Sequence, residues 1–599
     1  MNSLSMGNNL TNSKYEEIFL KIIADLSPLF IEDKTDLTKL ENSLNTSGGI
    51  LKTIKLNSDR ISCNLKKEVR MFFEKMASWI QNNFSCVKLY SVIMLISNFL
   101  SALEFEIEIS REKITNLLQL ETYDQIMEAT SYDKEEKIKE EEYLKKDSLI
   151  TNSFLSSFYY LITAMSNKQE IVVKSKNLLR SVLTVMTQIC EIDKIAIYFK
   201  KKRIISIFIK ILKILRSIQK DNEEYFIQVA KIAMSFFAKI GMKREIYRDY
   251  MFKKAVPDLM TDIYLQFYIK ENNNDISKIF SIYTFFTIRT VDHKTFFWSK
   301  GVINAMLKII NNVICEKTEN EISNEKNLNQ NQNSLNKENI SLIEYLTLAL
   351  YNLTIDNIEV QSELIDHNYL KLAKEILIKY SNNNFILFNV ISSLRRIRDE
   401  EYLEKVTEEL LYTYFALFDY FYLKTKKSLE DCENSCEESS ISTNSFDFII
   451  LKELVAILGN IVKDEFHTKP FIDKNLHVVL IDLILSFTSF PKLIKNTIGA
   501  LINLTNNEDI REEFSRAAAF INSIYLILDK YKENPSIVDY ELKLIINIVK
   551  NEFVIKTFIS GDMFFYLILF MKNYFDYDEI LTNVLKIIRN LILKSKIIL

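Results

Sequence analysis

The sequence predicts an all-α protein built as a solenoid of helical repeats, and three observations lead to this prediction. Apolar residues recur at the spacing of an amphipathic helix, as at Leu476, Leu480 and Leu483. The 599 residues include only 8 glycines and 5 prolines, so few positions favour the tight turns of β-hairpins. A short motif also returns along the chain at a nearly constant distance.

The motif is an asparagine with an apolar residue two positions before it and another directly after it. Asn460, Asn503, Asn547 and Asn590 fit this frame and are 43, 44 and 43 residues apart. A period of about 40–47 residues made of amphipathic helices is typical of HEAT and armadillo solenoids. Each repeat of a solenoid contacts mainly its neighbours, and the stack presents one long concave surface. The period therefore indicates a protein that binds partners.

The frame extends toward the N-terminus with other residues in the asparagine position, and Asn98 is its earliest member. We call these residues the frame positions and expect the later ones, from about residue 171 onward, to lie on equivalent helices of one elongated body. In chain order they are Gln188, Lys239, Thr287, Asn352, Arg396, Asn460, Asn503, Asn547 and Asn590.

An aromatic residue follows eleven positions after most frame positions. A large ring at one fixed place in a repeat is suited to fill its core, so we expect these residues to be buried anchors rather than partner contacts. They are Phe199, Tyr250, Trp298, Phe471, Phe514 and Phe558.

Two distances along the frame, 65 and 64 residues, exceed one period by about 20. Polar stretches near 316–339 and 429–445 lie in these gaps. We expect both to be largely disordered surface loops, because their composition cannot bury enough apolar area to offset the cost of ordering.

A charged run at 133–147 carries the same expectation and marks a boundary in the chain. The sequence before it, 1–149, predicts a helical N-terminal region with degenerate repeats and a charged linker. The armadillo-like solenoid is predicted to occupy 150–599.

Composition and charge limit the classes of partner. The net charge is −3 with 26% charged residues, so no basic field points to nucleic acid. The longest uncharged apolar stretch, 89–103, is too short to cross about 30 Å of hydrocarbon. The polar residues 1–13 do not resemble a signal peptide. We expect a cytoplasmic protein with no membrane insertion.

Catalytic and metal-binding motifs are missing from the sequence. Its four histidines are scattered, and GxSxG, HExxH, P-loop and GxGxxG patterns do not occur. Cys432 and Cys436 would need two further ligands to hold zinc, and none lies near them in the sequence. We therefore expect no catalytic residues, no metal, no cofactor and no small-molecule substrate.

The asparagines provide one polar group for each repeat. An asparagine side chain offers a donor and an acceptor, so a column of them can pair with the backbone of an extended peptide. The alternative is that each one bonds a neighbouring helix and stabilises the stack. On the first reading, the candidate partner-binding residues are Asn352, Asn460, Asn503, Asn547, Asn590, Lys543, Lys586 and Arg589.

Two lysines favour an acidic partner. Lys543 precedes Asn547 by four residues, and Lys586 precedes Asn590 by the same number. Residues at this spacing share one face of a helix. We expect the concave groove to bind an extended or acidic protein segment there.

Three segments resemble armadillo repeats, namely Ala349–Leu353, Phe297–Ile303 and Gly499–Thr505. The family consensus has an Ala-Leu-x-Asn-Leu third helix, and an apolar anchor before a glycine-containing turn. The resemblance implies a right-handed superhelix of three-helix units whose third helices line a groove.

Nuclear-import adaptors of this class carry a tryptophan four residues before the asparagine to hold basic peptides. That array is missing from this sequence, which argues against import cargo of that type. The corresponding residues are Leu348, Ala456, Gly499, Lys543 and Lys586.

Residues 451–552 also resemble the C-terminal repeats of the armadillo repeat-containing protein 2 family. That resemblance implies a role in assembling the axoneme of cilia or flagella, and a location at the cytoskeleton or cilium. Two alternatives stay open, a general trafficking or motor-cargo adaptor and a nuclear-transport-type helical repeat. The features that favour the second are Lys200–Arg203 and the cations Lys543, Lys586 and Arg589.

Overall fold

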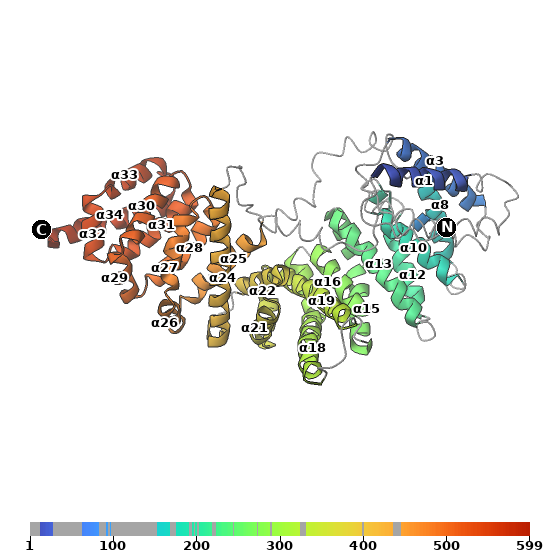
Figure 1. Ribbon diagram of the computed structural model, residues 1–599, viewed down its shortest axis with the longest axis horizontal. Coiled ribbons are helices and arrows are strands. Elements are labelled where there is room, and N and C mark those ends of the chain that lie inside the picture. Colours follow the sequence, from blue (N-terminus) through green and yellow to red (C-terminus); the bar gives the residue numbers. More distant parts are fainter. Residues whose placement is uncertain are drawn as a thin grey trace. The chain divides into compact units, whose positions relative to one another are not determined.

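The computed structural model describes part of the chain, and its regular elements there are α-helices with no strand among them (Figure 1). The all-α prediction is therefore confirmed. The described residues are 12–27, 63–82, 92–93, 96–97, 152–167, 175–190, 195–196, 198–199, 203–217, 223–243, 245–271, 274–287, 290–323, 331–397, 401–434 and 445–598.

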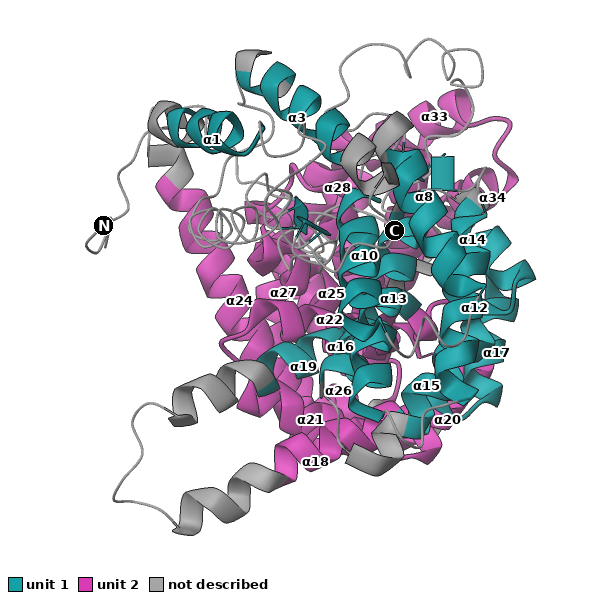
Figure 2. Cartoon of the chain, turned by 90° about the vertical axis from the view of Figure 1, so that its right-hand side faces the viewer, with its two compact units in different colours: residues 1–305, 337–349 teal, residues 306–336, 350–599 magenta. Residues whose placement is uncertain are grey.

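The chain divides into two compact units, each described here by itself (Figure 2). Unit 1 comprises 1–305 and 337–349, and unit 2 comprises 306–336 and 350–599. The predicted boundary near residue 150 stays a prediction, because the adjoining sequence lies outside the described residues.

The helices of the first half vary in length, from 9 residues in α14 to 24 in α19. Their bounds are α1 Asn12–Leu26, α3 Cys63–Asn82, α8 Asn152–Ser166, α10 Lys176–Ile189, α12 Ile204–Ser217, α13 Glu223–Lys243, α14 Glu245–Lys253, α15 Val256–Glu271, α16 Asn274–Thr287, α17 Val291–Ser299, α18 Val302–Ser323 and α19 Asn331–Thr354.

The second half is more regular, because each repeat has a short first helix, a second helix and a third helix. The first helices α20, α26, α29 and α32 have 9 residues each. In order, the bounds are α20 Ile358–Asp366, α21 Tyr369–Lys379, α22 Asn384–Arg396, α23 Glu401–Lys405, α24 Glu408–Asn434, α25 Phe446–Ile461, α26 Glu465–Asp473, α27 Leu476–Ser486, α28 Pro491–Leu504, α29 Glu508–Arg516, α30 Ala518–Lys530, α31 Pro535–Ile548, α32 Glu552–Ser560, α33 Met563–Asn573 and α34 Asp578–Ile598.

Asparagines start many of these helices. Asn357, Asn383, Asn507, Asn534 and Asn551 are N-caps whose side chains accept hydrogen bonds from backbone N–H groups of the first turn. A capping side chain satisfies a donor that has no partner inside the helix. These asparagines therefore fix where the helices begin.

The frame positions lie on nine corresponding helices, as predicted. These helices are α10, α13, α16, α19, α22, α25, α28, α31 and α34. Asn590 lies in the middle of its long helix, and the others lie near the C-terminal ends of theirs. The third helices of unit 2 pack in succession, α22 on α25, α25 on α28, α28 on α31 and α31 on α34. Asn98 lies outside the described residues.

The aromatic anchors are confirmed in most repeats and wrong in two. Phe199, Phe471, Phe514 and Phe558 are at most 2% exposed. Tyr250 and Trp298 are only half-buried. Their places in the core are taken by neighbours that face inward instead, Met251 and Phe297, both 0% exposed.

The predicted loops are partly helical, which corrects the expectation for two of them. Helix α18 continues to Ser323 and α19 begins at Asn331, so helix covers much of 316–339. Helix α24 continues to Asn434, into the second stretch. Glutamate and lysine there are good helix formers, so a polar composition extends a helix that has already started. Residues 133–147 lie outside the described residues.

The turn between the first and second helix has a recurring left-handed residue. Arg203, Ala255, Gly301, Asn368 and Asn475 have φ between 55° and 72°. Glycine adopts this conformation freely and asparagine more readily than most residues, whereas an alanine is strained there. Ala255 is therefore a local weakness in unit 1.

Replacing Ala255 by Gly should stabilise unit 1, and replacing Gly301 by Ala should destabilise it. Ala255 is exposed, and nothing lies within 4 Å of a Cβ built on Gly301, so backbone strain decides both changes. We expect each shift to be on the order of 1 kcal/mol, measured as the denaturant midpoint and as hydrogen exchange in α14, α15, α17 and α18. If both variants stabilised unit 1, or both destabilised it, this reasoning would be contradicted.

Candidate functional site

The candidate site is one face of four successive third helices in unit 2, which Figure 1 labels α25, α28, α31 and α34. We call it the amide face and define it by each frame asparagine and the residue four positions before it. Asn460, Lys543 and Lys586 are exposed, and the other members are half-buried. The amide face comprises Ala456, Asn460, Gly499, Asn503, Lys543, Asn547, Lys586 and Asn590.

Frame asparagines join two of these helices, α28 and α31, to the third helix before each. Asn503 Nδ2 donates to the Gly459 carbonyl oxygen at 2.7 Å, and Asn547 Nδ2 donates to the Ile502 carbonyl oxygen at 3.1 Å. These carbonyls lie near the C-terminal ends of helices, where the backbone has acceptors left over. The expectation that the asparagines stabilise the stack is therefore met at two positions.

The same two asparagines keep an acceptor. Because Gly459 and Ile502 offer carbonyl oxygens, the nitrogen of each carboxamide must point toward them. Among the described residues, nothing donates to Oδ1 of Asn503 or Asn547. The nitrogen of each side chain stabilises the stack, and its oxygen is left available to a partner. The two hypotheses for these asparagines, stabilisation and peptide binding, are therefore compatible.

Glycine at position 459 allows this close helix contact. A Cβ built on Gly459 would lie 3.1 Å from Ala500 Cβ and 3.2 Å from its Cα. Such contacts are tighter than normal packing, so any larger residue would push α25 away from α28 and lengthen the bond from Asn503.

The cations of the site differ in how far they are neutralised. Lys543 Nζ lies 2.6 Å from Asp539 Oδ2, and Asn583 Nδ2 donates to Asp539 Oδ1 at 3.0 Å. The hydrogen bond that Lys543 donates to Asp539 raises the pKa of Lys543. Lys586 and Arg589 are exposed and make no ion pair with the described residues. Positive charge is therefore available mainly at α34.

The sequence analysis missed Tyr540 and the groups around it. Lys495 Nζ lies 4.7 Å from the centre of the Tyr540 ring and Lys543 Nζ lies 5.6 Å from it. Tyr540 also packs 3.5 Å from the position of a Cβ on Gly499. Tyr540 lies seven residues before Asn547, and Lys495 lies eight before Asn503. Residues at these spacings lie close to the helix face of the frame asparagine, so the sequence could have indicated both.

Asn352 does not belong to an accessible site. Its side chain is 0% exposed, which corrects its assignment as a partner-binding residue. On the next third helix, Phe388 is 5% exposed and its ring lies 5.6 Å from Tyr351 and 5.9 Å from Phe446. Phe388 occupies the position that carries Lys452, Lys495 and Asp539 in the later repeats.

Frame position 396 is held by an arginine that packs on Tyr351 of the preceding third helix, α19. Arg396 Cζ lies 4.8 Å from the centre of the Tyr351 ring. Beside it, Arg395 Nη1 lies 2.7 Å from Glu453 Oε2. Burial would raise the pKa of Glu453, but Arg395 and other nearby cations hold it below its usual value. These contacts are structural, since Glu453 is buried.

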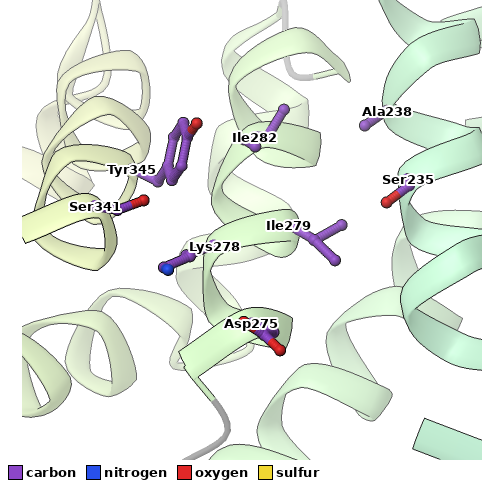
Figure 3. Close-up of a pocket in the computed structure, with 8 residues that line it drawn as sticks. All are labelled: Ser235, Ala238, Asp275, Lys278, Ile279, Ile282, Ser341 and Tyr345. Carbon is purple, nitrogen blue, oxygen red and sulfur yellow. The ribbon is translucent and has the colours of Figure 1, made fainter. Parts of the chain in front are cut away.

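Unit 1 contains a small cavity of about 110 Å³ between α13, α16 and α19 (Figure 3). It is much smaller than the roughly 300–1,000 Å³ of typical ligand sites. Lys231 Nζ lies 2.6 Å from Asp275 Oδ2 at its margin. The lining residues are Ser235, Ala238, Asp275, Lys278, Ile279, Ile282, Ser341 and Tyr345.

Within the described residues, no group of three or more His, Cys, Asp or Glu side chains is placed to hold a metal ion. Cys436 lies outside that part of the chain. No single described helix is both long enough and apolar enough to cross a membrane.

No family model and no curated protein matches the chain. A structure from work on a phosphorylation switch in the interaction between cadherin and β-catenin has a TM-score of 0.52 at 11% identity, covering 95% of this chain and 100% of that one. Structures of SYS-1 and of SYS-1 with POP-1 give TM-scores of 0.42 and 0.39, at 11% and 10% identity. They cover 97% of this chain, and 99% and 93% of theirs. The chain has an armadillo-type all-α solenoid fold.

Glu541 is a buried carboxyl group behind the amide face, on α31. It is 1% exposed, and neither carboxyl oxygen has a hydrogen-bond partner among the described residues. Burial raises its pKa to about 8. The matching positions in the neighbouring repeats hold Thr497 and Val584, which are both 0% exposed. Of these three buried residues, only Glu541 carries an ionisable group.

Asn503→Ala should lower stability while Asn460→Ala should leave it nearly unchanged. The first removes the bond to Gly459, which leaves a carbonyl without its donor and costs about 1–2 kcal/mol. Asn460 is exposed and has no such bond, so it is the matched control. Urea denaturation and hydrogen exchange in α25 and α28 would measure the difference. Equal effects would mean that the amide bond contributes nothing to the stack.

The stability of unit 2 should fall as pH rises from about 4.5 toward 8 through Glu541. Its folded pKa lies above its unfolded value, so the folded form binds the proton more tightly and loses this advantage as pH rises, by at most about 1.4 kcal/mol per pH unit. Glu541→Gln should remove this dependence. The control Glu552→Gln, on the exposed start of α32, should retain it. Denaturation curves at several pH values would decide, and an unchanged slope in Glu541→Gln would contradict the assignment.

Proposed function

We propose that the protein is a non-enzymatic scaffold or adaptor that binds an extended, acidic protein segment along the amide face. The observation that carries this proposal is the free carboxamide oxygen of Asn503 and of Asn547. The next third helix, α34, adds Lys586 and Arg589, cations that make no ion pair with the described residues. Carboxamide oxygens accept hydrogen bonds from a peptide backbone, and the cations attract carboxylates.

The spacing of the helices suits an extended chain. Packed helices lie about 8–10 Å apart, and an extended peptide advances about 3.3 Å per residue. Successive asparagines would therefore meet the backbone N–H of about every third residue. Side chains between these contacts would face the lysines.

Charge along the site favours carboxylates toward α34. Lys543 is largely compensated by Asp539, whereas Lys586 and Arg589 are not paired. Exposed ion pairs are weak one by one, so binding would depend on several repeats at once and would weaken with salt.

Reversing charge at Lys586 and Arg589 together should weaken partner binding by about tenfold, since each exposed pair contributes up to about 1 kcal/mol. The probe is a set of extended Asp/Glu-rich peptides selected against the full protein, with affinity measured by fluorescence anisotropy at two salt concentrations. The matched control reverses Lys556 and Lys572, which are exposed on α32 and α33 and lie off the amide face.

Equal weakening in both double variants would indicate a general charge effect and overturn the proposed site. Selection of basic or neutral peptides instead would overturn the acidic partner. Circular dichroism must show the same helix content in every variant for these outcomes to count.

We propose the cytoplasm as the place of action, with the axoneme of cilia or flagella as the more specific setting. The support is the resemblance of 451–552 to armadillo repeat-containing protein 2. Synthesis confined to cells that build flagella would favour this setting. Constitutive synthesis would favour a general trafficking or motor-cargo adaptor, and nuclear accumulation a nuclear-transport role.

A further inference from the structure

Helices α33 and α34 expose apolar side chains on the flank that faces away from α31. Ile568 is 64% exposed, Met571 38%, Leu585 55% and Ile592 48%, and Ile588 is half-buried. We call these five residues the end face. All belong to unit 2.

The repeat register shows that most of these positions are interior ones elsewhere. Leu585 corresponds to Leu542, Ile592 to Val549, and Met571 to Leu528, and those three residues are at most 1% exposed. In the earlier repeats the next repeat covers them, as the packing of α28 on α31 and of α31 on α34 illustrates. The end face therefore continues the interface between repeats.

The end face is apolar and exposed in the part of the chain that the structure describes. Its leucine, isoleucine and methionine side chains leave water only when another surface covers them. An exposed apolar patch of this kind marks an interaction site.

We propose that a second copy of this chain covers the end face, related by a two-fold axis. The charges of α34 favour this occupant. Asp578 and Glu579 lie in its first turn, whereas Lys586 and Arg589 follow in its later turns. Two copies of α34 packed antiparallel place the acidic start of each helix opposite the basic part of the other.

The geometry is self-complementary, as a two-fold interface must be. Asp578 lies about 10 Å before Leu585 along the helix and Arg589 about 6 Å after it, at about 1.5 Å per residue. An axis close to Leu585 brings Asp578 of one copy near Arg589 of the second and places apolar side chains between them. A parallel arrangement would set like charges side by side.

The dimer goes beyond the proposed binding function and does not depend on it. It would carry two amide faces, so a partner with two acidic segments would gain avidity from both. Both proposals use Lys586 and Arg589, so Leu585→Glu, which changes neither cation, separates them. Loss of the dimer with peptide binding retained would support the dimer as a separate property, and loss of peptide binding with an intact dimer would overturn only the amide face.

The test is the mass of the full chain in sedimentation velocity and light scattering across micromolar concentrations. We expect about twice the 70.4 kDa of one chain. Leu585→Glu should weaken dimerisation at least about tenfold, because it buries a charge in the apolar centre. Leu593→Glu is the matched control, since Leu593 is 51% exposed and its equivalents Lys550 and Asn506 are exposed too.

A charge exchange tests the antiparallel arrangement. Asp578→Arg and Arg589→Asp should each weaken the dimer, and the double variant should restore it. A single mass of 70.4 kDa at every concentration would overturn the proposal, as would a dimer indifferent to Leu585→Glu. Masses that grow without limit would indicate head-to-tail filaments and would also overturn it.

Discussion

The close stacking of consecutive third helices is the constraint on which the described architecture of unit 2 depends. Helices α25, α28 and α31 pack against a third helix on either side. Helices α25 and α28 approach so closely that a Cβ on Gly459 would lie only 3.1 Å from Ala500 Cβ. At that distance a side chain of one helix can reach the backbone of the previous one, so Asn503 bonds Gly459. Burial of apolar side chains supplies most of the free energy of stacking. The hydrogen bond from Asn503 sets how α28 is aligned along α25.

One residue type therefore serves the fold and the proposed site together. The carboxamide nitrogen of Asn547 is used inside the stack, where it reaches Ile502, while its oxygen is left to the surface. This arrangement holds the acceptor rigidly, because the same side chain is anchored at its other end. A preorganised acceptor loses little conformational entropy when a peptide binds.

Two buried glutamates show how the context of a repeat decides the state of a carboxyl group. Glu453 has Arg395 at 2.7 Å, and its pKa falls below the usual value. Glu541 has no partner among the described residues, and burial raises its pKa to about 8. A charge in a low-dielectric layer is retained only where an opposite charge or a donor offsets the loss of hydration.

The sequence by itself determined the all-α class, the period and the helix that carries each frame position, because apolar periodicity and repeat length are local properties of the chain. It did not determine exposure: Asn352 and Asn503 occupy the same frame position, yet only Asn503 lies at the surface. That difference depends on packing between repeats, which a frame position by itself does not specify. The anchors at Tyr250 and Trp298 failed for a similar reason, since a shift of one residue turns a helical side chain by about 100° and only packing decides which neighbour faces inward. Which cations stay unpaired was likewise settled by the fold, because ion pairing depends on distances that sequence spacing gives only within one helix.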